Sequence, residues 1–381
     1  PLAPRCADCH GSHEILPATE AQSKLSSQNI VSTCQQCHAG ATRRFAGYLT
    51  HATHHDPHKY PWIFWTFWLM TALLVGTFAA SGIHTLLWLP KSLEMRRLHP
   101  PKPVDPNEKQ YVRFPLLYRI LHAVMIVSFL TLAVTGMTLK FSYTKWAMFI
   151  SHLLGGFAVS GFLHRTAAVI LVGVFCTHCW DLVRRKNKEF GSWKNMLTGP
   201  DTILFTLRDV REFLATLKWY MGKGPRPRYG RWTYWEKFDY FAVFWGITVI
   251  GGSGLMLWFP VAFTTILPGW VINVATIIHS DEALLAAGFI FTIHFFNTHF
   301  RPERFPMDIV IFTGRMSVEE LKRERPAEYE ELVRRGELEK RLADPLSPKM
   351  VRAIRIFGWT ALVIGLTLVV GIIYAMIFVY Q

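Results

Sequence analysis

The chain has 381 residues, of which 51% are hydrophobic and 14% aromatic, and its formal net charge is +14. A soluble protein this basic would suggest a nucleic-acid partner, but here the charges cluster between long apolar runs, which is typical of membrane topology. No RNA- or DNA-binding motif stands out. We therefore expect an all-α integral membrane protein.

Two copies of the pattern Cys-x-x-Cys-His lie at the N-terminal end of the chain. The first has Cys6, Cys9 and His10, and the second has Cys34, Cys37 and His38. This spacing predicts two covalent c-type haems, because two thiols bind the vinyl groups and the adjacent histidine coordinates the iron. A zinc ribbon or a pair of disulfides could use the same four cysteines, but neither gives a role to the histidine after each pair.

Residues 1–60 are predicted to form a small dihaem segment on the periplasmic side, where the two haems serve as most of the core. Such a segment must be exported, so we expect a signal peptide or a longer N-terminal region before Pro1. The second iron ligands are expected among the other histidines of this segment, namely His13, His51, His54, His55 and His58.

Six apolar runs follow, each long enough to cross a hydrocarbon layer of ~30 Å at ~1.5 Å per residue. The fifth is the weakest by hydropathy, because it carries Asp281, Glu282 and three histidines. The predicted spans are 61–89, 116–140, 157–183, 238–260, 279–300 and 354–380.

The distribution of basic residues orients these helices. With residues 1–60 outside, the connections 90–115, 184–237 and 301–353 are cytoplasmic and carry 6, 13 and 12 Lys+Arg. The two outer connections carry only Lys145. The asymmetry follows the positive-inside rule and agrees with the side on which c haem is attached. We expect the protein in a bacterial inner membrane.

Three other segments carry weaker signals. Apolar residues at helical spacing within 184–237 predict an amphipathic helix near the membrane surface. The segment 317–341 begins like a capping box and is dense in Glu, Arg and Lys, which favours a solvated helix with ion pairs. Cys176 and Cys179 lack a following histidine and are expected to be buried free thiols. The apolar residues of the amphipathic pattern are Leu204, Leu207, Val210, Phe213, Leu214 and Leu217.

Histidines recur inside the predicted membrane helices, where an ionisable residue is a functional hypothesis. His164 and His178 are 14 residues apart, and His279 and His294 are 15 apart, so each pair lies near one helix face with its members at opposite depths. Topology puts the first member of each pair near the periplasmic face and the second near the cytoplasmic face. The other membrane histidines near the cytoplasmic face are His84, His122 and His299.

Around these histidines the chain resembles the cytochrome b subunits of respiratory formate dehydrogenases and nickel–iron hydrogenases. The resemblance rests on Arg119-Ile120-Leu121-His122 followed by Thr135-Gly136, on His164-Arg165, on Ser253-Gly254 before Trp258, on His279 and His294, and on Thr313-Gly314-Arg315-Met316-Ser317. It implies a four-helix bundle over about 115–335 with two b haems and quinone exchange near the cytoplasmic haem. By resemblance, His164 pairs with His279 and His122 with His294.

Two departures from that family matter. Its spacing on the last helix is usually 14 rather than 15, so we expect a local helix bulge. His178 is an extra candidate, and bare geometry also allows it to pair with His294, so both pairings stay open, as does a third b haem that uses His84. The first helix with its loop (61–114), the dihaem segment and the tail 336–381 lie outside the family pattern. The whole chain looks like a fused cytochrome b/c quinone oxidoreductase.

The predicted function is electron transfer between menaquinone or ubiquinone in the membrane and periplasmic cytochromes or oxidoreductase subunits, within a multi-subunit respiratory complex. Polar groups at the right depth to contact quinone or a haem propionate are Arg119, Asp239, Asn297 and His299. The alternatives are a haem-carrying membrane anchor without its own quinone site, and a reductase that takes electrons from a cytoplasmic donor docked on 184–237.

Overall fold

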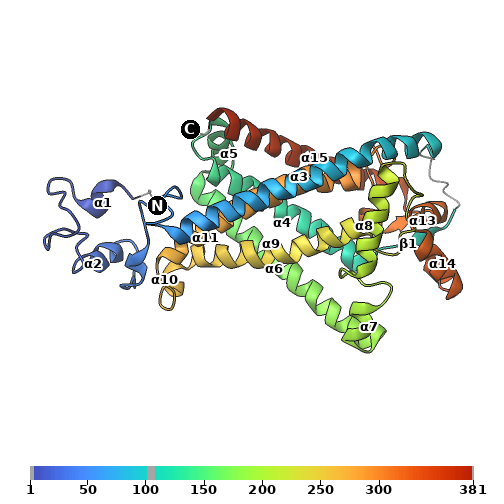
Figure 1. Cartoon of the computed structure of the whole chain (residues 1–381), viewed down its shortest axis with the longest axis horizontal. Helices are drawn as coiled ribbons and strands as arrows, with labels where there is room; N and C mark the ends of the chain where they lie inside the picture. Colours follow the sequence, from blue (N-terminus) through green and yellow to red (C-terminus); the bar gives the residue numbers. More distant parts are fainter. Residues whose placement is uncertain (1–3, 101–107, 380–381) are drawn as a thin grey trace. The chain divides into compact units, whose positions relative to one another are not determined.

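The computed structural model describes residues 4–100 and 108–379 and is mostly helical (Figure 1). Six of the described helices are long and apolar enough to cross a membrane, which confirms the predicted number of spans and the membrane class. The outermost predicted ends, at Pro1 and residue 380, lie outside the described residues. The six helices, each with any π-helical turn that continues it, are α3 (Pro61–Leu98), α4 (Leu116–Lys140), α6 (Phe157–Phe190), α9 (Tyr234–Trp258), α11 (Trp270–Phe300) and α15 (Pro348–Val379).

Two helices extend well beyond the predicted spans. Helix α3 continues through Pro90 to Leu98, and α11 begins at Trp270 rather than at residue 279. Hydropathy marks only the apolar part of a helix, whereas the backbone hydrogen bonds continue into polar flanks. His279 therefore lies in the interior of α11, about 14 Å along the axis from its first residue.

The described chain forms two compact units. The first contains the chain up to Gly76 together with Gly246–Leu285, and the second contains Thr77–Trp245 together with Ala286 onward. The first unit carries both Cys-x-x-Cys-His motifs, on the short helices α1 (Cys6–His10) and α2 (Ile30–Gln35). It also holds a 3₁₀ turn (Phe45–Gly47), the short helix α10 (Pro260–Phe263), the beginnings of α3 and α11 and the end of α9.

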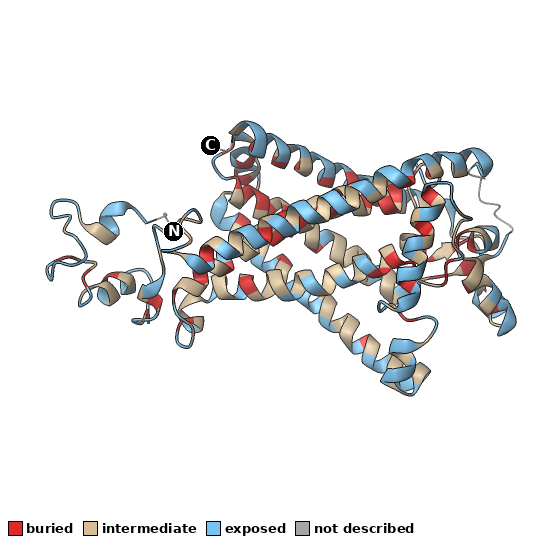
Figure 2. Cartoon of the chain, in the orientation of Figure 1, coloured by how far each residue is buried: buried red, intermediate tan, exposed pale blue. Residues whose placement is uncertain are grey.

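In the second unit, α4 packs against α6, α15 and the short helix α5 (Lys145–Leu153). Thr144 caps α5 by accepting a hydrogen bond from the Ala147 N–H. Large apolar side chains remain exposed along the long helices, for example Leu86 on α3 and Val370 on α15. Figure 2 shows the exposed residues along both helices. Lipid is the environment in which such exposure carries no penalty.

Residues 108–115, 226–239 and 297–343 of this second unit form a small assembly of short strands, short helices and ion pairs, which we call the base. A sheet joins β1 (Gln110–Val112) antiparallel to β2 (Arg315–Met316) and β3 (Leu342–Ala343), in the order β2-β1-β3. Tyr111, Met316, Leu321 and Leu332 form its apolar core. The sequence did not predict this sheet, because strands of two or three residues leave no periodic signal.

The segment 317–341 is not the single solvated helix that the sequence predicted. Ser317 caps α13 (Val318–Glu324), as the capping pattern indicated, but Pro326 starts a separate helix, α14 (Pro326–Arg334). Glu324 and Glu328 are buried in ion pairs, because these helices pack on the sheet. The remaining short elements are α7 (Trp193–Thr198), α12 (Val310–Thr313) and a 3₁₀ turn (Glu339–Arg341).

The amphipathic pattern within 184–237 does form a helix, α8 (Leu207–Tyr220). Leu204, the first residue of the pattern, lies before this helix. Its apolar residues Leu207 and Val210 are exposed, whereas Asp209 is buried in an ion pair with Lys237 (2.9 Å). The helix thus buries Asp209, Thr216 and Tyr220 and leaves large apolar side chains exposed, which suits contact with lipid. Cys176 is exposed and Cys179 half-buried, so the prediction of buried thiols is wrong.

Candidate functional site

Both Cys-x-x-Cys-His motifs adopt a helical turn. Helix α1 carries Cys6, Cys9 and His10, and at these spacings all three lie on one helix face. In the second motif the His38 N–H donates to the carbonyl of Cys34 (2.9 Å), which closes the same kind of turn. Burial raises the pKa of the Cys34 thiol and the nearby Cys9 raises it further, so the two motifs lie close together.

His10 faces a second histidine. The ring centroids of His10 and His51 are 6.1 Å apart. Two imidazoles on opposite sides of one metal ion, with metal–nitrogen bonds of about 2 Å, have their centroids about 6 Å apart. His51 therefore stands at the separation that a shared iron requires.

The other histidines of the segment have different surroundings. The His38 ring contacts Phe45, with centroids 4.7 Å apart. His54 stacks on Phe67 of α3 and touches His55, and burial followed by the charge of His55 lowers the pKa of His54. His13, His55 and His58 are exposed, as is His51.

Polar contacts tie this segment to the loop before α11 and to α11 itself, all within the first unit. Asn273 accepts a hydrogen bond from the Leu49 N–H (3.0 Å) and donates to the Leu49 carbonyl (2.9 Å), as a neighbouring strand would. Arg44 donates to the carbonyls of Thr265 and Ile266. These contacts fix the backbone two residues before His51. Sequence reasoning missed Asn273 and Arg44, because their partners lie more than 200 residues away.

His164 on α6 is held by a hydroxyl on α4. The Thr135 hydroxyl donates to the Thr131 carbonyl (2.6 Å), so its oxygen accepts from Nδ1–H of His164 at 3.0 Å. With the proton on Nδ1, Nε2 carries the lone pair through which a neutral imidazole binds a metal. The neighbouring Gly136 makes room for the ring, since a Cβ there would lie 3.1 Å from Cε1 of His164.

His279 on α11 repeats this arrangement with α9. Its Nδ1–H donates to the Ile250 carbonyl (3.0 Å), and the Ser253 hydroxyl lies at 3.4 Å from the same nitrogen. A Cβ on Gly254 would lie 3.0 Å from Cε1 of His279. The pairs Thr135-Gly136 and Ser253-Gly254 thus provide the same oxygen and the same missing Cβ to two histidines.

His294 is held by a charged group instead. Its Nδ1 lies 2.9 Å from Oδ2 of Asp239 on α9, and a carboxylate can only accept, so the imidazole donates. A π-helical turn, Ile290–His294, lies between His279 and His294 on α11. This is the local bulge predicted for the 15-residue spacing, because a π turn absorbs one extra residue.

Three further side chains gather near His294 in the second unit. His122 is half-buried and interacts electrostatically with His294 and His299, and its Nδ1 is buried with no hydrogen-bond partner among the described residues. The rings of His122 and His299 both face Phe312. Arg119 does not join this group, since its Nε donates to the Phe312 carbonyl (2.7 Å) and its side chain packs on Gly314.

His178 and His84 are engaged through the other ring nitrogen. Nε2 of His178 lies 2.9 Å from the Tyr240 hydroxyl, and Nε2 of His84 lies 2.6 Å from the Tyr234 hydroxyl. Among the described residues, the rings in contact with His84 belong to Trp88, Phe213, Tyr220 and Tyr234. These two histidines therefore differ from the three whose Nδ1 is held by an oxygen.

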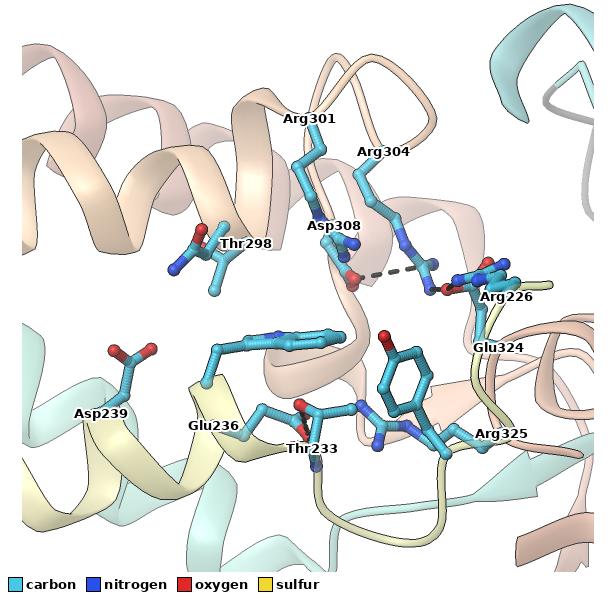
Figure 3. A pocket seen from close by; sticks show the side chains of 13 residues that line it. Arg226, Thr233, Glu236, Asp239, Thr298, Arg301, Arg304, Asp308, Glu324 and Arg325 are labelled. Atoms are coloured by element: carbon cyan, nitrogen blue, oxygen red, sulfur yellow. Dashed lines mark hydrogen bonds and ion pairs between the residues drawn. The ribbon is translucent and has the colours of Figure 1, made fainter. Parts of the chain in front are cut away.

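A polar cavity of about 90 Å³ lies beside Asp239 in the base (Figure 3). Four of its lining side chains have a buried polar atom without a partner among the described residues: Asp239 Oδ1, Asn297 Oδ1, Arg301 Nε and Arg304 Nε. Small-molecule pockets occupy ~300 Å³ or more, so this cavity suits water molecules rather than a quinone head group.

Ion pairs close the far wall of the cavity. Glu324 accepts a hydrogen bond from Arg226 (2.8 Å) and lies 3.6 Å from Arg304. Burial opposes ionisation of Glu324, but Arg226, Arg304 and Arg301 hold its pKa well below the usual range. The wall therefore stays charged at neutral pH.

These donor sets fit haem iron. His10 and His51 have a separation compatible with a shared iron, and the ring of each of the three membrane histidines is oriented by an oxygen on a neighbouring helix, as in most metal-binding histidines. No protein-family model, curated protein or solved structure matches this chain in the comparisons made.

Proposed function

We propose that this chain transfers electrons across a bacterial inner membrane, from a quinol to periplasmic one-electron carriers, through b and c haems. One observation carries the proposal: three histidines on apolar helices, His164, His279 and His294, each donate Nδ1–H to an oxygen on a neighbouring helix. A histidine held in this way would bind haem iron through Nε2. Haem, when bound, supplies the one-electron redox chemistry.

For the b haems the proposal keeps the pairings that the family resemblance implies, His164 with His279 and His122 with His294. Two contacts favour His122 over His178 as the partner of His294. His122 is half-buried within electrostatic range of His294, whereas Nε2 of His178 is occupied by the Tyr240 hydroxyl. A third b haem on His84 is not favoured, because its Nε2 is held by Tyr234 among aromatic rings.

For the c haems, Cys6 and Cys9 would bind the first group and Cys34 and Cys37 the second. His10 and His51 would ligate the first iron, which their 6.1 Å ring separation supports. His38 would provide one ligand to the second iron. The proximity of Cys9 and Cys34 favours rapid exchange between the two groups.

The quinone site is proposed near the haem of His294, on the cytoplasmic side. His299 suits a contact with the quinone, because it is buried and its Nδ1 has no hydrogen-bond partner in the described part of the chain. Asn297 faces the water-sized cavity and suits a propionate or water contact better. Oxidation of one quinol would yield one quinone, two protons and two electrons, and the electrons would pass singly to two external carriers.

Reduction kinetics of the purified, haem-loaded protein test this proposal. A reduced menaquinol or ubiquinol analogue should reduce the b haems before the c haems, and a quinone-site inhibitor should block both. Reduction of b haem only through c haem, or no effect of the inhibitor, would reject the quinone site. The chain would then be a haem-carrying anchor for a larger complex.

A further inference from the structure

The three membrane histidines with a bonded Nδ1 differ in the charge of the oxygen that holds them. His164 donates to a hydroxyl and His279 to a backbone carbonyl, and both acceptors are neutral. His294 donates to the carboxylate of Asp239 at 2.9 Å. The side chains of this pair are 22% and 17% exposed, so solvent screens their interaction only partly.

We propose that Asp239 is a positioning residue that fixes the ring of His294 and gives the haem bound there the lower midpoint potential of the two b haems. This inference rests on the proposed function, because it takes His294 to be an iron ligand. A hydrogen bond to a carboxylate makes an imidazole more basic, and a more basic ligand favours ferric over ferrous iron. A nearby negative charge acts in the same direction.

The surroundings of Asp239 keep that carboxylate oriented. Oδ2 is taken by His294, while Oδ1 lines the polar cavity with no protein partner among the described residues. Arg301 and Arg304 line the same cavity, and within the described ranges the Nε of each has no hydrogen-bond partner. A cavity of about 90 Å³ with these acceptors and donors has the size and polarity to hold ordered water. Such waters would bridge Oδ1 to the arginines and hold Oδ2 against the imidazole.

The difference between the neutral acceptors of His164 and His279 and the charged acceptor of His294 has a functional consequence. Neutral oxygens at His164 and His279 leave those ligands less basic than His294. The potential then rises from the haem of His294 toward the haem of the other two histidines. If His294 lies on the cytoplasmic side, as proposed, the axial ligands themselves favour outward electron transfer.

The test is redox titration of the haem-loaded protein with Asp239→Asn, which keeps the size of the side chain and removes its charge. We expect the b-haem content to be retained and the lower b-haem midpoint to rise by about 59 mV, the equivalent of a tenfold change in the ferric-to-ferrous preference. The low-spin paramagnetic resonance signal of that haem should move with it. Asp239→Glu, which restores the charge, should return the midpoint toward its original value.

Control variants separate this inference from the function on which it rests. Thr135→Val removes the neutral acceptor of His164 and should leave the lower midpoint unchanged. His294→Ala should remove one b haem. If His294→Ala retains all b haem, the ligand assignment and the proposed function fail together.

If His294→Ala loses a haem but both midpoints are unchanged in Asp239→Asn, the role of Asp239 alone is overturned. If Asp239→Asn loses haem, the charge-retaining Asp239→Glu decides. Recovery of haem together with the low midpoint supports the inference, and recovery of haem at a raised midpoint overturns it.

Discussion

Replacement of Gly254 by alanine should release haem b by displacing a single ring. A Cβ at this position would lie 3.0 Å from Cε1 and 3.3 Å from Nδ1 of His279. Non-bonded carbon atoms prefer separations of about 3.5–4.0 Å, so the ring must move by about 0.5 Å. That shift would lengthen its 3.0 Å bond to the Ile250 carbonyl toward the limit of hydrogen bonding.

The expected loss of haem affinity can be estimated from the hydrogen bond that orients the His279 ring. A lost hydrogen bond costs about 0.5–1.5 kcal/mol, and removal of a group that orients a metal ligand typically weakens metal binding by about 10–100-fold. We expect Gly254→Ala to weaken haem b binding about tenfold, or about 1.4 kcal/mol. A loss of haem in this variant would be informative, because alanine inside a helix is otherwise about 1 kcal/mol more favourable for folding than glycine.

The assay is the ratio of haem b to haem c in purified protein, together with haem titration of depleted samples. Gly252→Ala is the matched control on the same helix, since a Cβ there meets nothing within 4 Å. Unchanged haem affinity in Gly254→Ala, or an equal loss in Gly252→Ala, would refute the argument that the missing Cβ makes room for the ligand.

Three further predictions follow from the other sites. His51→Ala, at the histidine whose ring lies 6.1 Å from that of His10, should convert one c haem from low spin to high spin in absorption and paramagnetic resonance spectra. His58→Ala, at another exposed histidine of the segment, should not, and equal effects of the two variants would count against the pairing of His10 with His51. Glu328→Gln should destabilise the base by about 3 kcal/mol in thermal unfolding, because Arg231 loses its carboxylate partner and the buried Arg113 keeps only Glu236. Glu330→Gln, in an exposed pair, should cost under about 1 kcal/mol. The depressed pKa of Glu324 means that its contribution to stability is complete above about pH 4.5 and is lost as the pH falls toward the folded-state pKa. Glu324→Gln should therefore reduce the fall of Tm at acid pH. An unchanged fall of Tm would contradict the ion-pair assignment.

The sequence by itself determined the membrane architecture. Apolar runs long enough to span a bilayer marked six helices, and each forms a helix in the structure. It also indicated the local irregularity on α11, because a spacing of 15 between His279 and His294 needs a bulge to keep both on one face, and a π turn lies between them. Such features are local in sequence, so periodicity and spacing encode them.

The surroundings of the candidate ligands were decided only by the tertiary structure. The acceptor of His164 is 29 residues away and that of His294 is 55 residues away, on other helices. The sequence ranked His122 and His178 almost equally, and the contacts that separate their surroundings, His178 with Tyr240 and His122 near His294, come from the tertiary structure. The base was also missed, since its strands are too short to have a period.

A histidine in an apolar helix has the same local pattern whether it serves as a ligand or as a packing residue. The ring nitrogen that is held differs between His164 and His178, and the atom that holds it comes from another helix. The sequence could therefore list the candidates, while the packing of helices determined how each imidazole is held.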